Sequence, residues 1–194
     1  MGLLKKVVFL DRDGTINRDS PDYIKSRSEF GFIPGAIAAI GELTAGGFTC
    51  IVITNQSALA RGFISTAELD AMHAMMCDEI AAGGGSIKDI FFCPHLPDAG
   101  CNCRKPAPGL LFRAQRKYNI DLTDAIMVGD STKDIECGHI AGCGRTVLVK
   151  SGKDADVEKQ LHQKNLTADY VAADLLEAVR WIIDYHERLQ LGGT

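Results

Sequence analysis

The chain has 194 residues, 46% of them hydrophobic, and a formal net charge of -4 at pH 7. The negative charge disfavours nonspecific binding to nucleic acid or acidic membranes, and no apolar stretch is long enough to cross a bilayer. The length allows a sizeable core, and we expect one domain over residues 1–194. The first residues show no signal-peptide pattern, so we expect a cytoplasmic protein, a monomer, whose partner is a small molecule.

Compact apolar runs alternate with amphipathic segments, a pattern that predicts an α/β fold with a mainly parallel sheet and helices on both faces. The predicted strands are 7–10, 49–54, 87–93, 125–129, 146–149 and 170–172. The clearest helix begins after Ser65, because Ser65 and Glu68 fit a capping box, and the glycines 83–85 end it. The last helix begins after Asp174, which stands in the same relation to Glu177.

Two irregular segments interrupt this alternation. Residues 17–32 are polar, and residues 94–108 are rich in Pro, Cys and Gly. Both segments follow predicted strands, and ligands of open α/β sheets bind beyond the carboxyl ends of the strands. We therefore expect the functional site near these two loops.

The first predicted strand ends in two carboxylates, Asp11 and Asp13. Residues i and i+2 of an extended backbone point the same way, so both side chains aim into one small volume. Two such anions repel each other unless a cation or a proton lies between them, which suggests a metal site, a shared proton, or a nucleophile beside an acid. Taken alone, a polar turn closed by Gly14 explains the pair equally well.

Polar side chains also follow the second strand, and two cations precede a helix that we predict to open at Pro108 and Gly109. Thr54, Asn55, Gln56 and Ser57 offer hydroxyl and amide groups that can bind an anion, although they are also ordinary turn residues. Arg104 and Lys105 can bind phosphate oxygens, or they can form a solvated basic pair.

The fourth strand ends in a second acidic segment, with Asp130 and Asp134. Its carboxylates suit Mg²⁺, whereas Asp130 could equally be a helix N-cap. Taken with the other strand ends, this segment completes a set suited to phosphoryl transfer: a nucleophile, donors, a cation and metal ligands. The sequence contains neither a P-loop motif nor a Gly-x-Gly-x-x-Gly fingerprint after Asp13, so neither motif offers another interpretation.

These segments resemble, in order, the four motifs of the haloacid dehalogenase (HAD) superfamily of phosphohydrolases: Asp11-Arg12-Asp13-Gly14-Thr15, Thr54-Asn55-Gln56, Lys105, and Gly129-Asp130 to Asp134. The resemblance implies a Rossmann-like HAD fold with a minimal cap. It implies that Asp11 attacks phosphorus and that Asp13 protonates the leaving oxygen and then activates water.

The same resemblance implies the supporting roles. Mg²⁺ would be held by Asp11, Asp130 and the backbone carbonyl of Asp13. Thr54 and Lys105 would stabilise the transferring phosphoryl group, and Asp134 would orient Lys105 or a metal-bound water.

Three cysteines and a histidine crowd into residues 93–103, as Cys93, His95, Cys101 and Cys103. A Cys₃His set is a common structural zinc site, and we expect a zinc-binding loop inserted here. Free thiols, or a redox pair at Cys101 and Cys103, are the alternatives. Because this loop ends directly before Arg104, zinc would also fix the neighbouring cations.

The zinc loop is similar to that of two groups within the superfamily, the D-glycero-D-manno-heptose 1,7-bisphosphate 7-phosphatases and the histidinol-phosphate phosphatases. The short Cys-Pro-His-Leu-Pro loop leans toward the second group, but residues 55–62, 104–109 and 147–153 resemble the first, which we favour. The expected reaction removes the C7 phosphate of the heptose, a step toward the lipopolysaccharide core. The resemblance assigns substrate binding to Asp11, Arg12, Asp13, Asp19, Ser20, Pro21, Asp22, Thr54, Asn55, Gln56, Ser57, Arg104 and Lys105.

A receiver-type signalling domain is the non-enzymatic alternative, since it too phosphorylates an Asp on an α/β sheet. Asp13 distinguishes the two, because an acid/base two residues after the acceptor would hydrolyse the phosphoenzyme. We therefore expect catalytic turnover.

Overall fold

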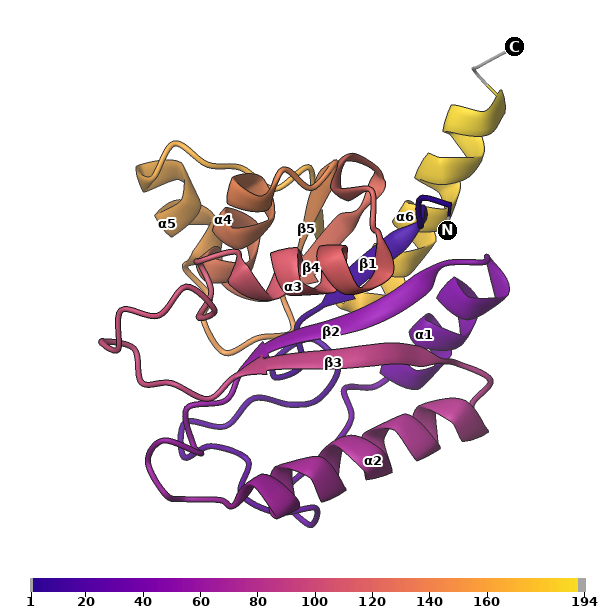
Figure 1. Cartoon of the computed structure of the whole chain (residues 1–194). Helices are drawn as coiled ribbons and strands as arrows, with labels where there is room; N and C mark the ends of the chain where they lie inside the picture. Colours follow the sequence, from indigo (N-terminus) through magenta and orange to yellow (C-terminus); the bar gives the residue numbers. More distant parts are fainter. Residues whose placement is uncertain (1, 192–194) are drawn as a thin grey trace.

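The computed structural model describes residues 2–191, and these contain one six-stranded sheet with the strand order β3-β2-β1-β4-β5-β6 (Figure 1). All of its pairings are parallel. The strands match the predicted ones, with ends that differ by no more than one residue: β1 (Val7–Leu10), β2 (Thr49–Asn55), β3 (Ile87–Cys93), β4 (Ile126–Gly129), β5 (Arg145–Val149) and β6 (Tyr170–Ala172).

Helices cover both faces of the sheet (Figure 1). One face carries α1 (Ala36–Ala45), α2 (Thr66–Ala82) and α6 (Leu175–Leu191). The other carries α3 (Gly109–Tyr118), α4 (Thr132–Ala141) and α5 (Val157–Gln163), with the short 3-10 helix η1 (Leu122–Asp124) before β4. The predicted α/β fold with helices on both faces is confirmed.

The central strand β1 shows how the sequence produces the two layers. Val8 and Leu10 belong to the core under α1 and α6, whereas Val7 and Phe9 belong to the core under α3 and α4. All four side chains are fully buried. A strand buried on both faces requires a continuous apolar run, which is why β1 shows no polar alternation.

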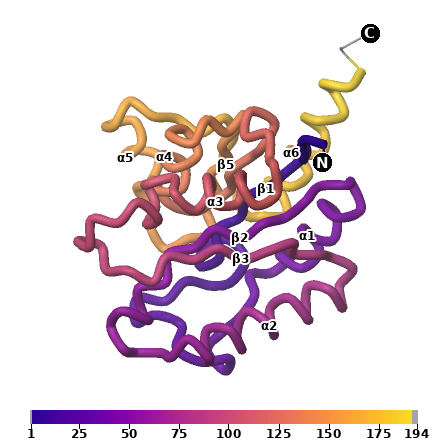
Figure 2. The backbone as a smooth tube through the Cα atoms, in the orientation of Figure 1, coloured from indigo at the N-terminus to yellow at the C-terminus, as the bar shows by residue number. Residues whose placement is uncertain are grey.

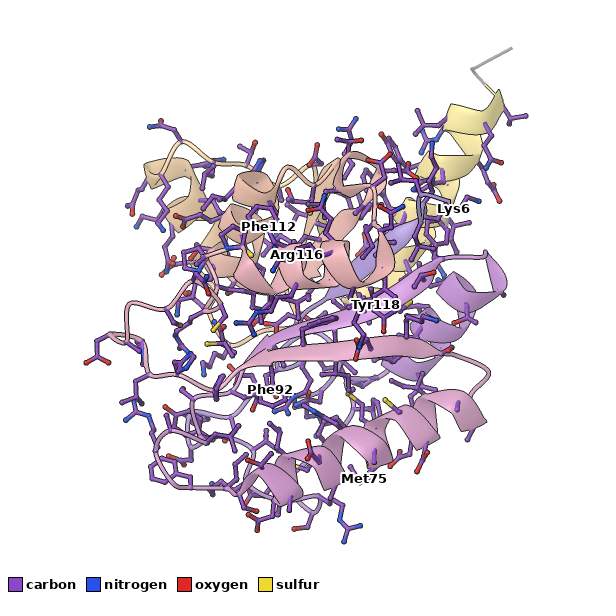
Figure 3. The ribbon with its side chains drawn as sticks, viewed as in Figure 1. Lys6, Met75, Phe92, Phe112, Arg116 and Tyr118 are labelled. Atoms are coloured by element: carbon purple, nitrogen blue, oxygen red, sulfur yellow. The ribbon has the colours of Figure 1, made fainter. Side chains whose placement is uncertain are left out.

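Helix α2 begins as predicted. The Ser65 hydroxyl accepts a hydrogen bond from the Glu68 backbone N–H, and the Glu68 carboxylate accepts one from the Ser65 N–H. Figure 3 shows Phe92 of β3 on the side that faces α2, where it packs against a small apolar cluster that includes Ile24 and Met72. This cluster anchors the irregular segment 17–32 against the start of α2.

The two ends of the sheet differ. The loops that follow the carboxyl ends of β1, β2 and β3 gather at one end, and the N-terminus and α6 lie toward the other (Figure 2). No helix within residues 2–191 has the length and hydropathy needed to cross a membrane.

Candidate active site

A cavity of about 450 Å³ opens at the carboxyl ends of the strands. Its size falls in the range of small-molecule sites. Most of the residues predicted from the sequence line it: Asp11, Asp13, Asp19, Ser20, Pro21, Thr54, Asn55, Gln56, Ser57, Arg104, Lys105 and Asp130. The parallel sheet therefore brings together segments that lie far apart in the chain.

Lys105 is the buried cation of this site. Its Nζ lies 2.8 Å from Asp11 Oδ1 and 2.5 Å from Asp134 Oδ1, and it donates a hydrogen bond to the Ile53 carbonyl at 2.8 Å. Burial alone would lower the pKa of Lys105, but the two carboxylates outweigh it and hold the pKa above its ordinary value. Lys105 therefore stays charged.

Asn55 fixes the backbone that carries this lysine. Its side chain accepts a hydrogen bond from the Lys105 N–H at 3.0 Å and donates one to the Lys105 carbonyl at 3.2 Å. The preceding residue, Thr54, is also buried, and its hydroxyl accepts a hydrogen bond from the Gln56 amide at 3.0 Å. The end of β2 thus positions the loop that leads into α3.

Three carboxylates meet beside Lys105. Oxygen atoms of Asp11, Asp130 and Asp134 all lie within 4.8 Å of one another. Burial, with repulsion from the neighbouring carboxylates, raises the pKa of Asp11 to about 7 and that of Asp130 to about 8. One lysine does not balance three carboxylates, and oxygen ligands of this kind are those that Mg²⁺ prefers. This donor set therefore fits Mg²⁺.

Close backbone packing makes this cluster possible. Gly14 has φ of 84°, and a Cβ at this position would lie 2.3 Å from Asp130 Oδ2. Only glycine combines that backbone angle with so close an approach. The turn after β1 is therefore part of the site, and it does more than close the strand.

Asp130 does not cap helix α4. Ser131 is the N-cap, and its N–H and hydroxyl both donate hydrogen bonds to Asp134 Oδ2, at 3.0 and 2.6 Å. Since the other oxygen of Asp134 contacts Lys105, both oxygens have partners. Asp130 is left available to face the cavity, which it lines.

Asp13 has different surroundings from Asp11, although only one residue separates them. Its carboxylate accepts hydrogen bonds from Arg12 Nε at 3.1 Å and Nη2 at 2.9 Å, and from the amides of Asn17 and Gln56 at 2.8 Å each. Burial opposes its charge, but Arg12 and these amides outweigh burial and hold the pKa of Asp13 below its ordinary value. Its carboxylate is absent from the three-carboxylate cluster.

Two of the side chains predicted to bind substrate lie outside the cavity lining. The Arg12 side chain is completely buried, binds Asp13 and His73, and does not line the cavity. Asp22 is exposed and likewise lies outside the cavity lining, although Ser20 and Pro21 belong to it. Neither side chain lines the cavity, so their assignment to substrate binding stays a prediction.

The loop after β5 supplies residues to which the sequence interpretation assigned no role in the site. Ser151 donates a hydrogen bond to the Gly14 carbonyl at 2.8 Å, and a Cβ at Gly152 would lie 2.0 Å from Asp130 Oδ2. These contacts place Lys153 at the cavity, where its Nζ lies 2.7 Å from Asp19 Oδ2. Lys133 of α4 lines the cavity as well. The resemblance of residues 147–153 to the heptose group was the available signal.

The cysteine cluster forms directly beside this cavity. The Sγ atoms of Cys93, Cys101 and Cys103 lie 3.2 to 3.6 Å apart, and His95 Nδ1 is 3.5 Å from Cys93 Sγ and 3.2 Å from Cys103 Sγ. Ligands of a tetrahedral Zn²⁺ are separated by roughly 3.5 to 3.8 Å, given its bond lengths. The cluster is compatible with one such ion. Arg104 is linked to this cluster by a hydrogen bond, which its Nη1 donates to the His95 carbonyl at 3.1 Å.

Comparisons with known proteins agree with this geometry. A family model described as HAD-hydrolase-like matches residues 102–178. The D-glycero-β-D-manno-heptose-1,7-bisphosphate 7-phosphatase of Pseudomonas aeruginosa is 45% identical over 170 residues, which cover 87% of this chain and 95% of the relative. The chain belongs to this family of HAD-like phosphatases. The Pseudomonas putida member is 44% identical, with 90% of this chain and 99% of the relative covered.

A solved structure supports the same membership. The D,D-heptose 1,7-bisphosphate phosphatase of B. bronchiseptica, crystallised with magnesium and phosphate, is 40% identical with a TM-score of 0.85, and the match covers 93% of this chain and 99% of that one. The predicted HAD-type phosphatase and the preference for the heptose group are therefore confirmed at the level of the family. The receiver-domain alternative is not supported, because the relatives are phosphatases.

Proposed function

We propose that this phosphatase removes the C7 phosphate of D-glycero-D-manno-heptose 1,7-bisphosphate through an aspartyl-phosphate. The observation that carries the proposal is the contrast between the two carboxylates at the end of β1. Asp11 contacts Lys105 within the acidic cluster, whereas four nitrogen atoms of Arg12, Asn17 and Gln56 bind Asp13. Neighbouring carboxyl groups whose pKa values are pushed apart are typical of separate roles in catalysis.

The first half-reaction transfers the phosphoryl group to Asp11. An oxygen of Asp11 forms a bond to phosphorus while the bond between phosphorus and the sugar oxygen breaks, and Asp13 gives its proton to that leaving oxygen. The negative charge of a bound phosphate favours the protonated form of Asp13 that this step requires. Lys105 and the Thr54 hydroxyl lie where they can balance the charge on the phosphoryl oxygens.

The second half-reaction restores the enzyme. Asp13, now a carboxylate, takes a proton from a water molecule whose oxygen bonds to phosphorus, and the bond between phosphorus and Asp11 breaks. Inorganic phosphate leaves, and Asp11 is again a carboxylate while Asp13 again carries its proton. The net change is the hydrolysis of one phosphomonoester.

We infer that Asp11 and Asp130, with the backbone carbonyl of Asp13, hold a catalytic Mg²⁺. The raised pKa values of Asp11 and Asp130 support this, as does the crystallised relative that contains magnesium. When bound, this ion supplies positive charge against the phosphoryl oxygens. Asp134, which contacts Lys105, would hold the lysine in place.

We further infer that Cys93, His95, Cys101 and Cys103 hold a structural Zn²⁺. A set of four ligands leaves no open position for water, and the ligand separations support one tetrahedral ion. Such a site needs reduced thiols, in keeping with a cytoplasmic location. Its role would be to fix the loop that carries Arg104 and Lys105.

A rate comparison tests the proposed substrate. Purified enzyme with Mg²⁺ is given heptose 1,7-bisphosphate and histidinol phosphate in parallel, and phosphate release is measured. We expect kcat/KM to be at least about 100-fold higher for the heptose, because Arg104, Lys133 and Lys153 line the cavity and suit a substrate with two phosphates. Preference for histidinol phosphate would overturn the proposal.

A further inference from the structure

Helix α2 places a polar side chain in the interior next to the site. Of the buried residues that the structure describes on α2, four are apolar and the fifth is His73. His73 is 7% exposed and does not line the cavity. Its Nε2 lies 3.2 Å from Nη1 of Arg12, and its ring centroid lies 6.0 Å from that of Phe92. A buried imidazole needs a specific polar partner, and here the partner is Arg12.

The contact with Arg12 decides the state of this histidine. A guanidinium has only N–H donors, so Nε2 of His73 must accept the hydrogen bond, which leaves the ring proton on Nδ1 and the imidazole neutral. The pKa of His73, lowered to about 4 by burial and by Arg12, agrees with this assignment. His73 thus satisfies the one side of the guanidinium that Asp13 does not reach.

Arg12 in turn forms hydrogen bonds with the Asp13 carboxylate. Its Nε and Nη2 bind Asp13 Oδ1 at 3.1 and 2.9 Å, and Nη2 also binds Oδ2 at 2.9 Å. Such a fork fixes the plane of a carboxylate as well as its position. Arg12 and Asp13 are neighbours in one loop; Gln56 holds the Asp13 carboxylate from outside that loop, and the Arg12 guanidinium needs an outside anchor of its own. His73, on a helix packed into the core, is this anchor.

We propose that His73 is a positioning residue, which holds Arg12 so that Arg12 keeps the Asp13 carboxylate in the orientation that delivers a proton to the leaving oxygen. Neither His73 nor the Arg12 side chain lines the cavity, so both act through Asp13. The inference rests on the proposed function only in assigning general-acid work to Asp13.

The experiment compares substrates that differ in their need for an acid. One is the heptose bisphosphate, and the other is p-nitrophenyl phosphate, whose leaving group departs without a proton. The variant His73→Leu removes the acceptor, whereas His73→Gln retains an oxygen that can accept from Arg12. We expect His73→Leu to lower kcat/KM about tenfold or more for the sugar phosphate and less than about threefold for p-nitrophenyl phosphate. His73→Gln should recover most of the loss.

The matched control is His186→Leu. His186 is also buried, at 8% exposure, but it packs against Phe48 far from the cavity lining. We expect this variant to change both substrates equally or not at all. Thermal unfolding is measured for each variant, and Arg12→Lys, which keeps the charge but loses the fork, replaces His73→Leu if that variant does not fold.

Three results would overturn the inference. They are an equal loss on both substrates with His73→Leu, no loss on either, and a His73→Gln variant as impaired as His73→Leu. If wild-type enzyme does not cleave heptose bisphosphate, the proposed substrate fails. The positioning role is then tested with any alkyl phosphate that the enzyme does cleave.

Discussion

Two clusters of side chains in this structure could each hold a metal ion, and they are built in different ways. The carboxylate cluster consists of Asp11, Asp130 and Asp134 with Lys105, which come from the ends of β1 and β4, the first turn of α4 and the loop before α3. The cysteine cluster consists of Cys93, His95, Cys101 and Cys103, all within residues 93–103.

The difference lies in what holds each cluster together. The sheet brings the three carboxylates together, and Lys105 holds two of them, Asp11 and Asp134, by contacts that need no metal. In the cysteine cluster, Cys93 and Cys103 are buried in the core beside α3, but His95 is exposed and Cys101 is half-buried, so packing supports two of the four side chains and leaves the loop between them less constrained. We therefore expect loss of Mg²⁺ to stop the chemistry and leave the fold intact, and loss of Zn²⁺ to disorder the loop and act on catalysis through Lys105.

The largest effect should follow from Asp11→Asn. Because an amide is a poor nucleophile, phosphate release should fall by at least about 1000-fold, while the thermal midpoint stays equal or rises, since a repelling carboxylate is removed. The matched control, Asp22→Asn, changes a carboxylate outside the cavity and should keep its rate within about twofold. Unchanged phosphate release by Asp11→Asn would contradict the assigned nucleophile.

A smaller loss is expected from Cys101→Ser. Weakened Zn²⁺ binding should release the loop that positions Arg104 and Lys105, so activity should fall about 10- to 100-fold. Elemental analysis and phosphate release measure the two effects. Cys77→Ser, at a half-buried cysteine of α2, should leave metal content and rate unchanged. Full activity in a zinc-free Cys101→Ser protein would show that the two clusters are independent.

The pH dependence of stability tests the carboxylate cluster. Without metal, the pKa values of Asp11 and Asp130 are about 7 and 8, against an ordinary value of 3.8. Between roughly pH 4 and 8 the folded state therefore keeps protons that the unfolded state has lost, so this contribution to stability decreases as pH rises. The pKa of Asp13 is lowered instead, so its contribution to stability changes with pH only below this range.

Mg²⁺ requires the deprotonated carboxylates, so its stabilising effect should grow with pH. We expect saturating Mg²⁺ to raise the thermal midpoint by about 5 °C more at pH 8.5 than at pH 5.5, as measured by thermal unfolding. Asp130→Asn, which removes one of the two titrating groups, should reduce this difference. An equal gain at both pH values would show that these carboxylates do not bind the ion.

The smallest effect concerns the rim of the cavity. Lys153 pairs with Asp19, but its side chain is 59% exposed, and exposed ion pairs contribute little to stability. Lys153→Ala should raise KM about three- to tenfold by removing a cation from the cavity, with kcat nearly unchanged. Lys150→Ala is the control, because Lys150 pairs with Glu158 and lies outside this cavity. A fall in kcat alone would contradict a role in binding.

Most of the scaffold could be predicted from the sequence. Buried parallel strands need continuous apolar runs, so each strand was visible within one residue of its observed ends. Ser65 and Glu68 marked the start of α2 by local hydrogen bonds alone. Because parallel strands share one carboxyl edge, the order of the polar strand ends was enough to place Asp11, Thr54 and Asp130 together, and Lys105 lies in the loop that follows β3 at the same edge.

The sequence by itself therefore determined the fold, the family motifs and most residues of the two candidate metal sites, since these depend on local patterns. Only the tertiary structure decided what each side chain contacts. The buried guanidinium of Arg12 contacts His73 of α2, which is far away in the chain. The pKa of Asp11 is raised and that of Asp13 is lowered, although only one residue separates them. The tertiary structure also brought Lys153 to Asp19. The reason is physical: burial and charge pairing depend on distances between segments far apart in the chain, and no local pattern encodes those distances.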